Sequence, residues 1–146
     1  DITTSTYTVN ENCKFIDYSA FYGCSGLTSI TLPEGLTSIG DFAFRGCSNL
    51  TSITLPSSLT SIGSNAFNGC SGLTSITLPE GLTSIGTSAF SGCSKLNSVT
   101  FKNTEGWQVS TSSDMSEAIS VDVSDPSTNA TYLTDTYGNY YWKRNV

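Results

Sequence analysis

The sequence predicts a repeat solenoid, a fold in which one short unit stacks on the next along a common axis. A 23-residue block recurs three times without a gap, as residues 24–46, 47–69 and 70–92. The first and third copies differ at three positions, and the middle copy differs from either of them at six. Near identity at a fixed period favours stacked coils within one domain over separate domains.

The same period continues on both sides of the three copies. Residues 16–24 match residues 39–47 at five positions, and residues 96–101 follow the pattern of residues 27–32. We therefore expect one domain with three parts: an N-terminal cap over residues 1–12, a solenoid over 13–101 and a C-terminal cap over 102–146. The N-terminal cap is expected to supply a short edge strand that covers the first coil.

Each coil carries enough apolar residues to line one interior. In the first copy the expected inward residues are Cys24, Leu27, Ile30, Leu32, Leu36, Ile39, Ala43 and Phe44. Residues 29–32 alternate with period two, which predicts a half-buried strand, and Pro33 ends it because proline lacks the N–H that a sheet needs. Leu36 and Ile39 predict a second extended side, and Asp41 is expected to cap one helical turn.

The C-terminal segment leaves the repeat. Residues 106–109 and 118–123 alternate as strands do, Asp125-Pro126 marks a turn, and aromatic residues are dense near the end of the chain. We interpret residues 102–146 as a cap, because an uncovered last coil would expose an aggregation-prone edge. As an alternative, an aromatic platform that stacks sugars would use Trp107, Tyr140, Tyr141 and Trp142.

Four of the five cysteines, Cys24, Cys47, Cys70 and Cys93, recur at the period of the repeat, and Cys13 precedes them. Stacked side chains on strands about 4.7–4.9 Å apart suit a disulfide poorly, because its Cβ atoms lie about 3.5–4.5 Å apart with a specific dihedral angle. Zinc sites use closely paired cysteines, which this chain lacks. We therefore expect buried, reduced thiols and no metal.

Composition excludes several classes of function. Charged residues make up 12% of the chain, the net charge is −6 and histidine is absent. Such a balance argues against binding to nucleic acid or to anionic membranes, and no apolar run reaches the roughly 20 residues of a membrane span. Without histidine there is no base for a serine or cysteine nucleophile, so we expect neither enzymatic activity nor a cofactor. A start at Asp1 without a signal segment indicates a removed leader or a trimmed protein.

One coil reads Leu-x-x-Ile-x-Leu-Pro-x-x-Leu-x-x-Ile-Gly-x-x-Ala-Phe-x-Gly-Cys-x-x. Over residues 13–101 this pattern resembles the BspA-like, or Treponema-type, class of leucine-rich repeats. Residues 129–133 and 140–144 resemble segments that close such proteins. The resemblance implies a right-handed superhelix of strand and loop with short helical turns, capped at both ends. It also implies an extracellular or cell-surface location, no catalytic residues, and adhesion to host or microbial surface proteins or glycans.

The outward residues of the main strand are the candidate ligand contacts: Ser29, Thr31, Ser52, Thr54, Ser75, Thr77, Ser98 and Thr100. They are the same pair in every coil, whereas a specific protein interface uses distinct aromatic or arginine anchors. A structural spacer or display scaffold without a specific ligand is therefore an alternative function. The threonine row also resembles an ice-binding face, although threonine is an ordinary residue on an exposed strand.

Overall fold

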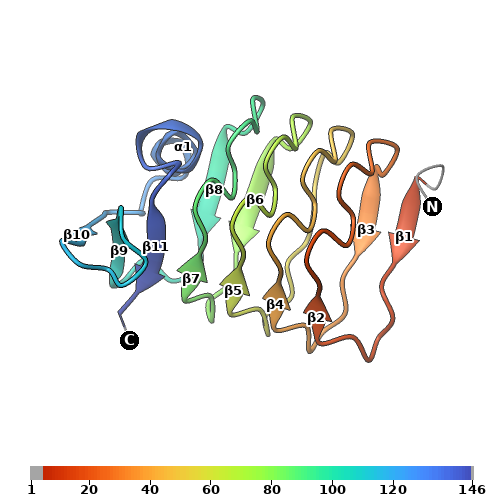
Figure 1. Ribbon diagram of the computed structural model, residues 1–146, viewed down its shortest axis with the longest axis horizontal. Coiled ribbons are helices and arrows are strands. Elements are labelled where there is room, and N and C mark those ends of the chain that lie inside the picture. Colours follow the sequence, from red (N-terminus) through yellow and green to blue (C-terminus); the bar gives the residue numbers. More distant parts are fainter. Residues whose placement is uncertain (1–4, 146) are drawn as a thin grey trace.

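A computed structural model describes residues 5–145, and it is a β-solenoid whose coils stack along the long axis of the molecule (Figure 1). One side of the coils holds β1 (Thr6–Thr8), β3 (Ser29–Thr31), β6 (Ser75–Leu78) and β8 (Ser98–Phe101). A second side holds β2 (Phe15–Ile16), β4 (Ser38–Ile39), β5 (Ser61–Ile62) and β7 (Ser84–Ile85). The predicted solenoid and its two extended sides are confirmed.

Every parallel strand pair joins residues that are one repeat apart in the sequence. Thr6 lies opposite Ser29, and Ser61 lies opposite Ser84. The edge strand expected near the N-terminus is β1, which pairs with β3 at the same offset as the repeat. Residues 1–4, also assigned to the N-terminal cap, lie outside the described residues. The sequence period therefore becomes the register of the sheets.

The turn side of each coil differs from the helical turn expected at Asp41. Phe42, Phe44 and Gly46 donate backbone hydrogen bonds to carbonyls of the next coil, at 2.8–2.9 Å. Those N–H groups are therefore not available for bonds within a helix. The Asp41 carboxylate likewise accepts from the N–H of Ser64 in the next coil, at 2.8 Å, and caps no helix. Backbone hydrogen bonds form between coils instead of within a helix. This side of the coils is therefore a third hydrogen-bond ladder.

The core consists of identical side chains stacked in columns. Phe21, Phe44, Phe67 and Phe90 form one column, with ring centroids 5.2–5.4 Å apart and interplanar angles of 3–9°. All eight positions expected to point inward are buried in the third copy, whereas Cys24 and Leu32 of the first copy are half-buried. The first copy is less covered because only the short N-terminal segment lies over it.

Three of the four stacked cysteines are buried, as predicted, and the four side chains are free thiols in this structure. Cys47, Cys70 and Cys93 are buried, and Cys24 is half-buried. Each of the three buried thiols donates to a phenylalanine carbonyl of the preceding coil, for example Cys70 Sγ to Phe44 O at 3.1 Å. These cysteines are therefore hydrogen-bond donors between coils as well as small apolar side chains.

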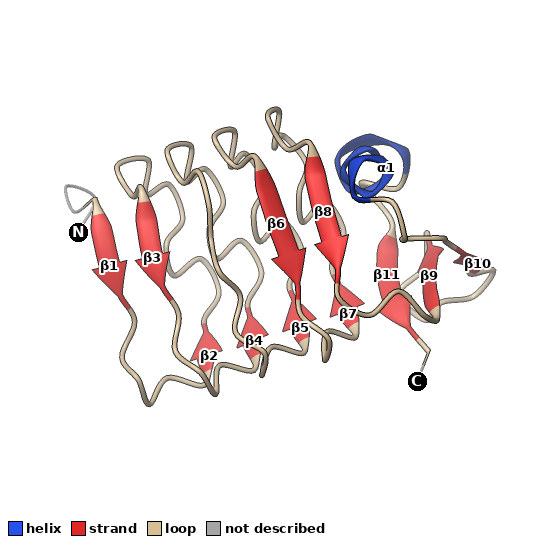
Figure 2. Cartoon of the chain, turned by 180° about the vertical axis from the view of Figure 1, so that it is seen from behind, coloured by secondary structure: helices blue, strands red, loops and turns tan. Residues whose placement is uncertain are grey.

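The C-terminal cap contains three strands and a short helix: β9 (Trp107–Ser110), β10 (Ile119–Ser120), α1 (Pro126–Thr131) with a following π-helical turn (Tyr132–Thr136), and β11 (Tyr141–Arg144). β11 runs antiparallel between β7 and β9, so it continues the second side of the solenoid. Figure 2 shows α1 over the end of the solenoid, beside β8.

The predicted turn at Asp125-Pro126 is in fact the start of α1. The Asp125 carboxylate accepts from the N–H of Thr128, at 3.0 Å, and proline occupies the first helical turn. Both features are preferred at helix starts. The fully buried Asn129 then donates to the carbonyls of Val99 and Val123, at 2.9 and 2.8 Å. One side chain thus ties the helix to β8.

Replacing Gly86 with alanine is expected to destabilise the fold, because a Cβ there would overlap the backbone nitrogen of Ser64. The matched control is Gly81→Ala, whose Cβ would meet Ser57 O at an ordinary 3.6 Å. We expect a loss in the free energy of unfolding of about 2 kcal/mol or more for Gly86→Ala and a change within about 1 kcal/mol for Gly81→Ala. Urea titration measures both, and equal losses would contradict the role of the close backbone approach.

Alkaline pH is expected to weaken the fold through the thiol column. Burial raises the pKa of Cys93 from its ordinary value of 9.0 to about 12, so the folded state holds the neutral thiol. That stabilisation is complete below pH 9.0 and is lost as the pH rises toward about 12. In Cys93→Ala the free energy of unfolding should fall less steeply over this window, by about 1.4 kcal/mol per pH unit. The control is the exposed neighbour, Ser94→Ala, which should keep the wild-type slope; equal slopes in all three proteins would refute the prediction.

Candidate functional site

The predicted strand face forms a hollow at its centre. Ser52, Thr54, Ser75 and Thr77 line an open depression of about 540 Å³. Glu80 and Lys102, which carry opposite charges, also line it. We call these six residues the strand-face hollow. The structure thus brings four of the eight predicted contact residues together.

The other four predicted strand residues lie outside this hollow. Thr31 lines a smaller depression of about 210 Å³ next to the first coil. Ser98 and Thr100 lie on β8, at the far edge of the face, and Ser29 lies on β3. The eight residues therefore share a face but do not form one site.

The hollow arises because the strand ladder is interrupted in the middle coil. Among the described strands, β3 pairs only with β1, and β6 pairs only with β8. Residues 52–55 follow the same path without pairing to either. A long hydrogen bond of 3.4 Å, from Thr74 N to Thr51 O, links the middle coil to the third just before these strands.

Two serines that distinguish the middle copy hold its turn to the first coil. Ser58 Oγ donates to Leu36 O at 2.7 Å and accepts from Gly35 N at 2.9 Å. Ser57 Oγ donates to the Glu34 carboxylate at 3.1 Å. These bonds join the middle turn to one neighbour only, and the larger hollow lies on the opposite side of the coil, toward the third copy.

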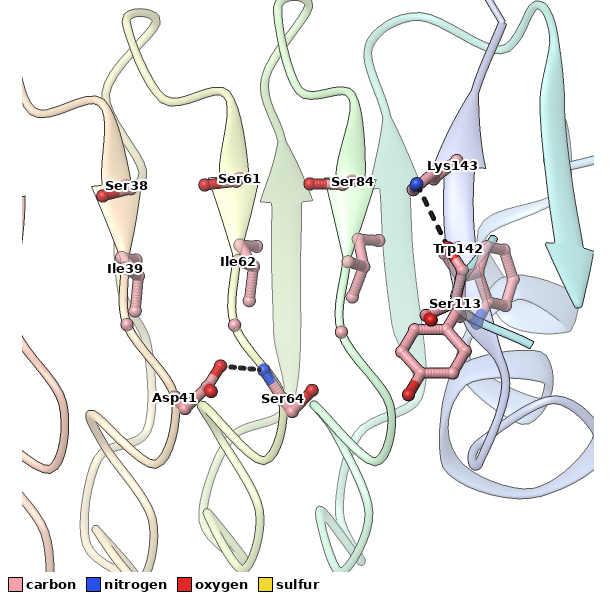
Figure 3. A pocket seen from close by; sticks show the side chains of 15 residues that line it. Ser38, Ile39, Asp41, Ser61, Ile62, Ser64, Ser84, Ser113, Trp142 and Lys143 are labelled. Carbon is pink, nitrogen blue, oxygen red and sulfur yellow. Dashed lines mark hydrogen bonds between the residues drawn. The ribbon is translucent and has the colours of Figure 1, made fainter. Parts of the chain in front are cut away.

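A second hollow, of about 460 Å³, lies across the second side of the coils. A row of outward serines, Ser38, Ser61 and Ser84, lines the hollow along its length, and Figure 3 shows their side chains pointing the same way. Asp41 lies near one end, and Lys143 of β11 closes the other, where its ammonium donates to Ser113 O at 3.3 Å. We call this the serine groove.

Sequence reasoning missed the serine groove for a structural reason. The groove has an end wall only because Lys143 of β11 lies opposite Ser84 of β7. That contact joins two residues that are far apart in the sequence, so the repeat pattern does not predict it. The floor is open where Gly40, Gly63 and Gly86 lack side chains, but these glycines are required by the close approach of the preceding coil.

Comparison with known proteins identifies the repeat. The sequence profile of the BspA type leucine rich repeat region matches residues 2–112, in six copies. The chain belongs to this family. The matched residues include 2–12 and 102–112, which lie in the two segments interpreted as caps. A search of curated proteins returns no match to the sequence.

Solved leucine-rich-repeat proteins share the architecture. A leucine-rich repeat protein from Bacteroides ovatus is 39% identical, with a TM-score of 0.61, over 66% of this chain and 25% of that one. The pneumococcal vaccine antigen PcpA is 34% identical, with a TM-score of 0.66, over 68% and 25% of the two chains. The T. pallidum leucine-rich repeat protein is 28% identical, with a TM-score of 0.56, over 65% and 57%. The chain thus spans a quarter to just over half the length of these proteins.

The two tryptophans of the C-terminal cap pack inward. Trp107 and Trp142 are 2% and 1% exposed, and both pack against Phe101. Their indole N–H groups donate to Asn103 O and Tyr137 O, at 3.0 and 3.2 Å. Tyr140 and Tyr141 are half-buried. A ligand that stacks on the predicted aromatic platform would therefore have to use the two tyrosines, because the tryptophan faces are covered.

The cap carboxylates serve local turns. Hydrogen bonds from the Ser116 N–H and the Ser112 hydroxyl lower the pKa of the exposed Asp114 to about 2. Bonds from Ser124 lower the pKa of Asp122, and bonds from Thr128 lower the pKa of Asp125. A general acid needs a raised pKa, so these shifts fit structural carboxylates that stay ionised.

Residues 5–145 hold neither a membrane-spanning helix nor a metal cluster. Within that range no helix is both long and apolar enough to cross a membrane. The described side chains also include no group of three or more histidine, cysteine, aspartate or glutamate residues placed to hold a metal ion. What the geometry offers is two open, hydroxyl-lined surfaces.

The burial of both tryptophans predicts a spectroscopic result. Trp107 and Trp142 lie in an apolar interior, so the folded protein should emit at short wavelength and resist quenching by acrylamide. Unfolding in guanidinium chloride should shift the emission to longer wavelength and restore quenching. Strong quenching of the folded protein would contradict the buried arrangement and reopen the tryptophan faces as ligand contacts.

Proposed function

We propose that the chain is a surface-exposed or secreted binding module that adheres to proteins or glycans through the strand-face hollow. The observation that carries the proposal is the convergence of Ser52, Thr54, Ser75 and Thr77 on one open depression that Glu80 and Lys102 also line. Hydroxyl groups both donate and accept hydrogen bonds. The hollow therefore suits polar partners, such as sugar hydroxyls or peptide groups.

The chemistry of this hollow favours weak contacts that are made many times. Each exposed hydroxyl adds little affinity, because it exchanges one hydrogen bond with water for another. Adhesion between surfaces tolerates weak single contacts, because linked contacts strengthen one another through their high effective concentration. Family membership and the name of one relative, a vaccine antigen, support an exposed location.

A structural spacer is the second candidate function. It is favoured by the near identity of the coils, of which the first and third copies differ at three positions. A spacer requires a regular stack and no individual contact residues. The hollow favours the binding function, because an interrupted strand ladder does not make a spacer more regular.

Lysine substitution within the hollow tests the proposal. We expect Thr54→Lys combined with Thr77→Lys to reduce binding by about 10-fold or more, because two long cations would fill the hollow and cost about 1.4 kcal/mol or more. The measurement is biolayer interferometry against a panel of extracellular-matrix proteins and glycans, with the exposed Thr111→Lys as control.

Three outcomes separate the functions. Loss of binding in the double variant alone supports the strand-face hollow. Unchanged binding excludes that face and favours the turns or the cap. If the wild-type protein binds no member of the panel, the spacer function is favoured.

A further inference from the structure

Exposed aromatic side chains gather at one place on the solenoid. Tyr18 and Tyr22 are 66% and 53% exposed, and both rings contact Phe42 of the next coil, with centroids 5.6 and 6.5 Å away. The guanidinium of Arg45 lies over the rings of Tyr22 and Phe42, at 5.7 and 5.5 Å. We call Tyr18, Tyr22, Phe42 and Arg45 the aromatic patch. It lies on the turn side of the first coils and shares no residue with the strand-face hollow.

The patch is built from the positions where near-identical coils differ. The first and third copies differ only at 41/87, 42/88 and 45/91. In the third copy these positions hold Thr87, Ser88 and Ser91; in the first they hold Asp41, Phe42 and Arg45. The small polar residues show that the turn itself needs no aromatic ring. The substitutions are therefore specific to this part of the surface.

Phe42 adopts a backbone conformation that its side chain does not favour. Its φ is 60°, and the equivalent residues Ser19, Asn65 and Ser88 have φ of 55–58°. Asparagine tolerates this left-handed region, whereas a bulky residue there is unusual. Strained residues of this kind cluster at functional sites. The local backbone therefore gives no reason for a phenylalanine at position 42.

We propose that the aromatic patch docks a basic protein segment, with an arginine or lysine side chain of the partner held on the exposed ring of Tyr18. A cation over an aromatic ring is attracted by the ring quadrupole, and Arg45 already shows this contact within the patch. Asp17 and Asp41, both exposed, flank the rings in sequence and outnumber Arg45 in charge. The whole chain carries a net charge of −6, which attracts a basic partner.

The first test is direct binding. The probe is a short blocked peptide rich in arginine, glycine and serine, compared with the same peptide in which glutamate replaces arginine. We expect the arginine peptide to bind and the glutamate peptide not to bind. Tyr18→Ala should weaken binding about 2- to 5-fold, the range expected for loss of an exposed cation–π contact. Ile119→Ala, which removes an apolar side chain that is 48% exposed in the cap, should leave binding unchanged.

Charge variants separate a local site from general attraction. Asp17→Asn should weaken binding more than Glu105→Gln, which makes the same charge change in the cap. Arg45→Gln should strengthen binding more than Lys95→Gln, because it also frees the rings of Tyr22 and Phe42 for the partner. Equal effects within either pair would overturn the proposal, since they would show attraction by net charge alone.

Two further outcomes would also overturn it. Binding of neutral oligosaccharides, but not of the arginine peptide, with loss in Tyr18→Ala, would make the patch a sugar platform. Self-association in sedimentation, lost in Tyr18→Ala and without peptide binding, would make the occupant a second copy of the chain. Tyr18 is exposed, so circular dichroism of each variant should match the wild-type protein and exclude unfolding as the cause.

Discussion

The fold depends on stacking at one fixed register, in which each residue lies beside its equivalent in the next copy. Each coil completes its hydrogen bonds and covers its interior only through its neighbours, because a single coil has two open faces. The stacked rings of Phe44 and Phe67 and the thiol of Cys70, which reaches back to Phe44 O, are two expressions of the same constraint. Gly86 is a third, since its missing side chain lets adjacent coils approach.

Because the register is the same for every coil, the features specific to one coil come from the positions at which the copies differ. Several residues that distinguish the middle copy bond to the first coil: Asn49 donates to Ser25 O at 2.6 Å, and Ser58 donates to Leu36 O. The residues that distinguish the first copy from the third contribute to the surface, and one of them, Asp41, also accepts a hydrogen bond from the Ser64 N–H of the next coil. Substitutions in a repeat thus order the coils, change the surface that the molecule presents to solvent, or do both, as Asp41 does.

The sequence predicted the parts of the structure that local pattern determines. The inward columns follow from apolar spacing within one coil, and the register follows from the period. The serine groove and the inward packing of Trp142 could not be predicted from the sequence. Both depend on the pairing of β11 with β7, which is distant in the sequence. The start of α1 was accessible, since Asp125 before Pro126 is a helix-start signal, but a turn explains the same dipeptide. The aromatic patch was missed because the contacts of Tyr18 and Tyr22 with Phe42 join different coils.

The antiparallel pairing of β11 with β7 limits how the array can lengthen. A further coil placed after β8 would meet a strand of the wrong direction, and the helix tied down by Asn129 occupies the same space. Insertion of one more copy among the internal ones would meet neither obstacle. Each inserted side chain would stack between equivalent side chains of the two neighbouring coils. Gene duplication inside the array can therefore lengthen the solenoid while the C-terminal cap stays intact.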